Sequence, residues 1–164
     1  MIVLLMGVCG CGKSTVGRAL AKDLSWAFLD ADDLHPPSNV EKMASGNPLT
    51  DEDRWPWYDR IAAELRQRVA SGRHVVLACS ALKQAYRDRL ARAGDLRVVY
   101  LKGDAAAIEP RLVSRKGHFM PASLLASQFA TLEEPADAIV VDLTQPIAAQ
   151  VATIARALRE ELPA

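Results

Sequence analysis

The residues best suited to chemistry stand together near the start of the chain, at positions 7–15. Their order matches the pattern G-x-x-x-x-G-K-S, a Walker A loop. The glycines let backbone N–H groups approach an anion, Lys13 can reach β- and γ-phosphates, and the Ser14 hydroxyl can ligate Mg²⁺. We therefore predict a nucleoside triphosphate site with Mg²⁺. Its candidate residues are Gly7, Val8, Cys9, Gly10, Cys11, Gly12, Lys13, Ser14 and Thr15.

A pair of carboxylates forms the second candidate group. Asp30 and Asp32 follow the apolar run 27–29, and side chains two residues apart in a strand point the same way. We expect one carboxylate to hold Mg²⁺ through water and the other to accept a proton from a substrate hydroxyl. The alternative is that these acids only cap the helix that follows.

Two arginines form the third group. Arg111 and Arg115 precede the glycine-containing break 116–121, which predicts a mobile lid over phosphates in the region 111–130. A basic helix end, stabilised by the helix dipole, explains this stretch equally well when it is taken alone.

The elements that must carry these groups alternate in type. Short apolar runs predict buried strands, and apolar residues at a spacing of four predict the helices between them. The alternation predicts an α/β three-layer P-loop fold, with a five-stranded parallel sheet, helices on both faces and a small lid. The first strand is expected at the centre, with ligands at the carboxyl edge. The expected strands are 2–6, 27–29, 75–79, 97–101 and 138–141.

The length of 164 residues predicts a single domain over 1–164. Within it, we expect the insert 35–70 to bind the acceptor. Ser38 and Glu41 have the spacing of a capping box and predict a short helix there. A second helix begins near residue 50, and Pro56 should kink or restart it. The two tryptophans beside Pro56 are expected in the core, although a platform for a ligand is the alternative.

Composition argues against several partners. Twenty basic residues balance twenty acidic ones, which disfavours broad binding to nucleic acid or to an anionic membrane. No apolar run approaches the ~20 residues of a membrane span, and no basic leader precedes the first run, so we expect a cytoplasmic protein. The three cysteines lack the spacing of a disulfide framework or a zinc site.

Three classes of P-loop protein fit these observations: a small-molecule kinase, a GTPase-like switch and a nucleotide-gated binding module. The switch is disfavoured because a guanine-reading Asn-Lys-x-Asp run is absent. A kinase needs an acceptor site, a proton acceptor and cations around the transferred phosphoryl group, and the chain offers all three. Basic residues near the strand ends favour a polar acceptor that could be anionic.

Several runs resemble those of the small gluconokinases, which belong to the shikimate-kinase-like branch of P-loop kinases. The most specific are Ser-Ala-Leu-Lys at 80–83 and His-Phe-Met at 118–120. The other runs are 30–36, 39–43, 48–54, 86–88, 100–103 and 127–129, so that the resemblance covers nearly the whole chain. It implies that ATP, with Mg²⁺, phosphorylates the 6-hydroxyl of D-gluconate to give 6-phospho-D-gluconate and ADP. Alternatives are a kinase for another sugar acid or a nucleoside monophosphate, or a binding module without phosphoryl transfer.

The resemblance also implies roles for individual residues. Lys13 would stabilise the transferring phosphoryl group, Asp32 would orient or deprotonate the hydroxyl, and Asp30 would lie with Ser14 at the metal. The catalytic candidates are Lys13, Asp32 and Arg115, and Arg111 and Arg115 would close onto the phosphates. The acceptor-binding candidates are Asp32, His35, Arg54, Ser80, Lys83, Arg87, His118 and Gln128, and the adenine-binding candidates are Thr144, Gln145 and Pro146.

Two features depart from the family pattern. Cys9 and Cys11 stand where small residues such as Ser are usual, and we hypothesise that these thiols make the loop sensitive to oxidation. Pro110 leaves the start of the lid helix open, because the helix should kink there or begin later than Asp104. The resemblance suggests a homodimer, for which the sequence shows no interface stripe.

Overall fold

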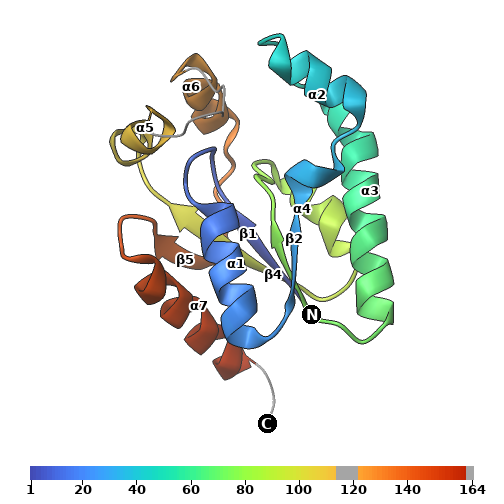
Figure 1. Cartoon of the computed structure of the whole chain (residues 1–164), viewed down its shortest axis with the longest axis vertical. Helices are drawn as coiled ribbons and strands as arrows, with labels where there is room; N and C mark the ends of the chain where they lie inside the picture. The colour runs from blue at the N-terminus through green and yellow to red at the C-terminus, as the bar shows by residue number, and fades with distance from the viewer. Residues whose placement is uncertain (114–121, 162–164) are drawn as a thin grey trace.

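A five-stranded parallel sheet lies at the centre of the computed structural model, which describes residues 1–113 and 122–161 (Figure 1). The strands are β1 (Ile2–Met6), β2 (Ala27–Asp30), β3 (Val75–Ala78), β4 (Leu96–Lys102) and β5 (Ile139–Asp142). Their order is β2-β3-β1-β4-β5, and every neighbouring pair is parallel. The predicted parallel sheet with the first strand at its centre is confirmed.

Helices cover both faces of this sheet. They are α1 (Lys13–Leu24), α2 (Pro37–Ala44), α3 (Asp51–Ala70), α4 (Gln84–Ala91), α5 (Ala105–Val113), α6 (Ala122–Thr131) and α7 (Ile147–Glu161), with a 3-10 turn, η1 (Ala31–Leu34). Helices α1 and α7 pack together on one face, and α3 and α4 pack together on the other. The predicted three layers are therefore confirmed.

Strand β1 shows why the core has two sides. All five of its residues are buried. Val3 and Leu5 belong to the core shared with α1 and α7, whereas Ile2, Leu4 and Met6 belong to the core shared with α3 and α4. Because successive strand side chains point to opposite faces, a central strand covered on both sides must be apolar throughout.

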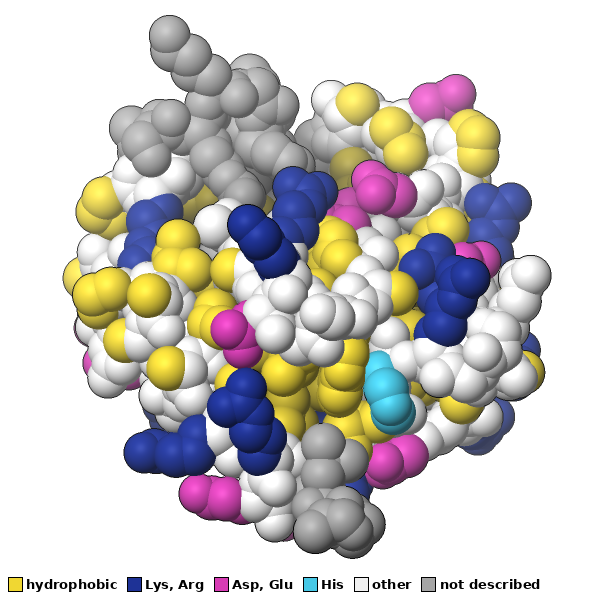
Figure 2. All heavy atoms as spheres, turned by 60° about the horizontal axis from the view of Figure 1, so that its bottom comes forward, with side chains coloured by type: hydrophobic (Ala, Val, Ile, Leu, Met, Phe, Trp, Pro, Cys, Tyr) yellow, Lys and Arg dark blue, Asp and Glu magenta, His cyan; other side chains and the backbone are white. Residues whose placement is uncertain are grey.

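Charged side chains of both signs are mixed over the surface. On the face shown in Figure 2, groups of Lys and Arg side chains are separated by acidic and apolar ones. The described residues on this face therefore form no continuous basic stripe of the kind that binds a nucleic acid backbone. Among the described residues, no helix is both long enough and apolar enough to cross a membrane.

The insert 35–70 forms α2 and α3, and α2 corrects one prediction. This helix begins at Pro37 without a side-chain cap, so the predicted capping box at 38–41 is wrong. Proline starts the helix because its fixed φ suits the first helical turn. A capping box does begin α3, where Thr50 and Asp53 each accept a hydrogen bond from the other's backbone N–H.

Helix α3 excludes one of the two outcomes predicted for Pro56. The helix runs for 20 residues through this proline, so it does not restart after it. Pro56 is exposed and has no N–H to donate to the carbonyl one turn earlier. The buried face of α3, which includes Trp57, Ile61 and Leu65, stabilises the helix across the interruption.

Replacement of Pro56 should therefore stabilise the protein. We expect Pro56→Ala to raise the free energy of unfolding by about 1–2 kcal/mol, because the restored hydrogen bond outweighs the entropy that the unfolded chain regains. Urea denaturation measures the change. Arg60→Ala, at an exposed position farther along α3, is the control and should stay within about 0.5 kcal/mol. A loss of stability in Pro56→Ala would contradict the account.

Candidate active site

The loop 7–12 connects β1 to α1 at the carboxyl edge of the sheet, as the sequence predicted. Gly7 and Gly10 have φ angles of 145° and 81°. A Cβ at these positions would lie 2.8 Å from the Cys11 Sγ and the Leu112 Cδ2, respectively. Both the left-handed backbone and the lack of space therefore require glycine. The N-terminus of α1 follows this turn directly, an arrangement suited to an anion.

Lys13 folds back over this loop. Its Nζ donates to the carbonyl oxygens of Gly7 and Val8, both at 3.0 Å, and lies 3.8 Å from the Cys11 Sγ. The ammonium is thus held at the loop that the sequence identified. Cys11 is fully buried whereas Cys9 is half-buried, so the oxidation hypothesis now concerns Cys9 alone.

Ser14 and Asp30 lie side by side. The Ser14 hydroxyl donates to the Asp30 Oδ2 at 2.6 Å, and the Asp30 Oδ1 accepts from the backbone N–H of Asp32 at 3.2 Å. Asp30 therefore also caps η1. Both side chains are oxygen donors of the kind that Mg²⁺ prefers, and this ion usually keeps waters and phosphate oxygens as its other ligands. In the described part of the chain, no group of three or more His, Cys, Asp or Glu could hold a metal.

Asp32 lies beyond the end of β2. The strand ends at Asp30 and the backbone turns into η1. The two carboxylates therefore do not share one strand, and the expectation that both point the same way along it is not met. The Asp32 side chain is 69% exposed at the carboxyl edge. The ring Nε2 of His35 lies 3.9 Å from its Oδ1.

His35 is buried between α2 and α3. Its ring stacks on Trp57 with centroids 3.9 Å apart, and its Nδ1 lies 3.4 Å from the Asn39 Nδ2. Burial, with a smaller effect from the Arg54 charge, lowers the pKa of His35 to about 4. The ring is therefore neutral at pH 7, and Nδ1 can accept from Asn39. Trp57 donates to the carbonyl of Ala31 at 2.7 Å, so this tryptophan is a core residue that braces η1.

Four residues from α3 and the start of α4 form a polar group that we name the Asp51 cluster: Asp51, Arg54, Lys83 and Tyr86. The Lys83 Nζ donates to both carboxylate oxygens of Asp51, at 3.1 and 2.9 Å, and the Tyr86 hydroxyl donates to one of them. The Lys83 Nζ and the Arg54 guanidinium lie 5.6 and 5.7 Å from the centre of the Tyr86 ring. These hydrogen bonds, from Tyr86 first and then from Lys83, lower the pKa of Asp51.

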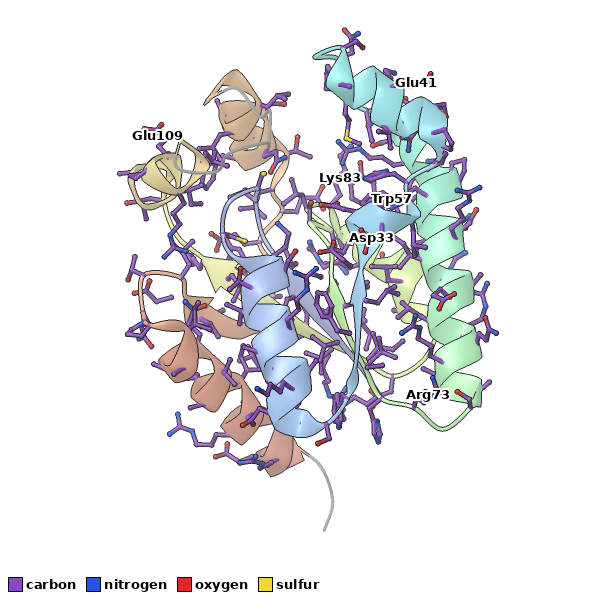
Figure 3. All side chains as sticks on the ribbon, in the orientation of Figure 1. Asp33, Glu41, Trp57, Arg73, Lys83 and Glu109 are labelled. Carbon is purple, nitrogen blue, oxygen red and sulfur yellow. The ribbon has the colours of Figure 1, made fainter. Side chains whose placement is uncertain are left out.

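The Asp51 cluster lies at the carboxyl edge. Figure 3 shows Lys83 and Trp57 at this end of the sheet, on the side of α2 and α3. The sequence predicted Arg54 and Lys83 as acceptor-binding residues, whereas Asp51 was predicted only to lie at the start of a helix. Acids in the first turn of a helix are common because they complement the dipole, so no local signal distinguished this one.

Arg87 requires a correction. Its side chain is buried, and its guanidinium donates to the carbonyl oxygens of Ala81, Leu82 and Glu133 at 2.9, 3.1 and 3.0 Å. Burial lowers its pKa. The predicted contact with the acceptor is therefore wrong, because the guanidinium braces the loop before α4 from within. Ser80, in the same loop, accepts from the backbone N–H of Gly7 at 3.3 Å and so connects it to the Walker A loop.

The described parts of the lid region also reach the Walker A side. Gln128 of α6 accepts from the backbone N–H of Cys9 at 2.6 Å, so it contacts the Walker A loop. Arg111 of α5 donates to the carbonyl of Leu143 at 2.6 Å. Helix α5 begins directly after Asp104 and runs through Pro110, so the late start that we considered does not occur. Arg115 and His118 lie outside the described residues.

The turn after β5 contains the candidate adenine contacts. Asp142 accepts from the backbone N–H and the hydroxyl of Thr144, at 2.8 and 2.7 Å. Asp142 thus stabilises the turn after β5 through its side chain. Thr144, Gln145 and Pro146 are exposed there, and the buried Gln150 fixes the turn by donating to the carbonyl of Gln145 at 2.7 Å.

Comparisons with known proteins decide the family. The family described as an AAA domain matches residues 2–135. The thermoresistant gluconokinase of Escherichia coli strain K12 is 46% identical over 166 residues, which cover 97% of this chain and 94% of that protein. The chain belongs to the gluconokinase family.

Solved structures agree with this gluconokinase assignment. The crystal structure of a gluconokinase from Sinorhizobium meliloti 1021 matches with a TM-score of 0.82 and 44% identity, covering 96% of this chain and 93% of that one. A shikimate kinase from Aquifex aeolicus matches with a TM-score of 0.64 and 16% identity, covering 98% of each chain, and so shares the fold alone.

The buried His35 should make the stability of this gluconokinase-family chain depend on pH. Its pKa falls from an ordinary 6.5 to about 4 on folding, so between these values the unfolded chain binds more protons. Stability is therefore lost as the pH drops from 6.5 towards 4. His35→Gln keeps an acceptor for Asn39. Between pH 7 and 4.5, we expect the free energy of unfolding of this variant to fall by about 1–2 kcal/mol less than that of the wild type. Urea denaturation at both pH values tests this, and equal losses would contradict a buried neutral ring.

Proposed function

We propose that this chain transfers the γ-phosphoryl group of ATP to the 6-hydroxyl of D-gluconate, giving 6-phospho-D-gluconate and ADP. The observation that carries the proposal is the arrangement at one edge of the sheet. A Walker A loop, the Ser14–Asp30 pair, the exposed Asp32 and the cationic Asp51 cluster meet there, in a chain of the gluconokinase family. Phosphoryl transfer to a sugar acid needs these four parts.

In the proposed reaction, Asp32 takes the proton of the gluconate 6-hydroxyl while the hydroxyl oxygen attacks the γ-phosphorus. The new O–P bond forms while the bond to the β–γ bridging oxygen breaks, and ADP leaves with that electron pair. Lys13 and the N–H groups of the loop 7–12 offset the negative charge on the phosphates. Mg²⁺, held by Ser14 and Asp30, would supply further screening of the β- and γ-phosphate charges.

The remaining assignments complete the proposal. In this proposal, Arg54, Lys83 and Ser80 contact the acceptor, and His35 borders the site where its Nε2 lies beside Asp32. Gln128 sets the position of α6 on the loop. The turn at 144–146 and Arg111 hold the nucleotide, and the lid region 111–130 closes over it with Arg115 and His118. We further propose that the enzyme acts in the cytoplasm as a homodimer.

An assay of ADP release with Mg-ATP tests the reaction. The panel contains D-gluconate, other sugar acids, shikimate, nucleoside monophosphates and water. Fast release with gluconate alone supports the proposal. Release with another acceptor would keep a kinase and overturn its substrate, and ATP binding without release above the water blank would indicate a binding module.

Lys13 should contribute to turnover rather than to folding. We expect Lys13→Ala to lower kcat by about 10²-fold or more, because the ammonium acts mainly on charge that develops in the transition state. The thermal unfolding temperature should change little. Lys22→Ala, which removes an exposed cation from the last turn of α1, is the control and should keep full activity. Unchanged turnover in Lys13→Ala would remove this residue from the mechanism.

Asp32 should accept the proton of the 6-hydroxyl during the reaction. We expect Asp32→Asn to lower kcat by about 10²-fold or more with little change in the KM for gluconate, because the amide cannot accept the proton. Steady-state kinetics separate the two constants. Asp33→Asn makes the same charge change at the adjacent exposed position and should leave kcat intact. If only KM rose in Asp32→Asn, this residue would bind the acceptor without taking its proton.

A further inference from the structure

The Asp51 carboxylate joins the first turn of α3 to the loop before α4. It accepts two hydrogen bonds from the Lys83 ammonium, at 3.1 and 2.9 Å, and another from the Tyr86 hydroxyl. It is also the first residue of α3, where the helix dipole favours a negative charge. The positive charge of Lys83 is therefore matched by an anion of the protein itself.

The neighbouring cations are satisfied in different ways. The Lys42 Nζ lies 2.6 Å from the Asp53 Oδ2, and the buried Arg87 donates to backbone carbonyls. Arg54 differs from them. It donates to the carbonyl of Leu49 at 3.4 Å and lies over the Tyr86 ring, and within the described residues it forms no ion pair with a carboxylate.

We propose that Asp51 determines the charge of the acceptor that this site accepts. The Asp51–Lys83 pair carries no net charge, so Arg54 leaves the Asp51 cluster with a net charge of about +1 at pH 7. An acid with one carboxylate and neutral hydroxyls matches this charge. A dicarboxylate exceeds this charge, because Asp51 already matches the charge of Lys83, and it is rejected on that ground. The inference rests on the proposed function and adds the rule by which acceptors are selected.

Asp51→Asn tests the rule because it removes the charge but keeps the shape and an oxygen that can accept from Tyr86. Glu52→Gln makes the same charge change at the next residue, which is exposed and forms no ion pair or side-chain hydrogen bond in the described part of the chain. The rate of 6-phosphogluconate formation is measured with both variants and the wild type. D-glucarate, a dianion without a 6-hydroxyl, and neutral D-glucitol serve as competitors.

In Asp51→Asn, the Ki of D-glucarate should fall about tenfold more than the KM of gluconate, because the unmatched Lys83 gives the site a second positive charge that favours a dianion over a monoanion. The Ki of D-glucitol should stay within about twofold of the wild-type value, since a neutral ligand has no net Coulomb interaction with the added charge. Glu52→Gln should match the wild type in all three constants. If Asp51→Asn does not fold, as judged by circular dichroism, Asp51→Ser removes the same charge and takes its place.

Two results would overturn the inference alone: equal shifts for all three ligands, which would mean a purely structural role, or no shift at all. A wild-type enzyme that does not phosphorylate gluconate would instead overturn the proposed function, and the inference with it.

Discussion

The tight turn between β1 and α1 is the constraint on which the rest of the site depends. It needs a buried central strand before it, a helix after it, and glycine where the backbone is left-handed and crowded. The loop then supplies the contact points for its neighbours. Gly7 donates to Ser80 of the loop before α4, Cys9 donates to Gln128 of α6, and the Lys13 ammonium binds the loop carbonyls. Parts of the chain that are far apart in sequence are thus assembled around one short segment.

The opposite side of the site is organised by charge. Helix α3 begins with three acids, and two of them hold lysines from other elements: Asp51 holds Lys83, and Asp53 holds Lys42. These pairs connect α2, α3 and the loop before α4 at the carboxyl edge. Partly exposed ion pairs contribute little to stability, so their value here lies in setting the local charge and the positions of the side chains.

The fold was predictable because its signals are local. Each strand contains a run of at least three apolar residues, and the Walker A pattern fixes the order of strand, loop and helix. The capping box expected at Ser38 and the helix restart considered after Pro56 are both absent, for a related reason. A local rule was applied at both places, but a proline start and a buried helix face determined the outcome.

The side-chain partners of the site were less predictable, because they come from distant parts of the chain. Asp51 meets Lys83 across 32 residues, and Arg87 meets the Glu133 carbonyl across 46. Only the tertiary fold shows that Arg87 is buried, or that Asp51 neutralises a lysine expected to be available. By contrast, the resemblance placed Ser14 and Asp30 together, and their side chains do form a hydrogen bond, from the start of α1 to the end of β2.

The position of the phosphoryl group in the product is the sharpest test of the proposed reaction. Wild-type protein would be incubated with Mg-ATP and D-gluconate labelled with ¹³C at C6, and the product examined by ¹³C and ³¹P NMR. The account predicts a single phosphate ester whose phosphorus couples to the labelled carbon, in proportion to the ADP formed. A phosphate on another carbon, or ADP formed together with free phosphate and unchanged gluconate, would contradict it.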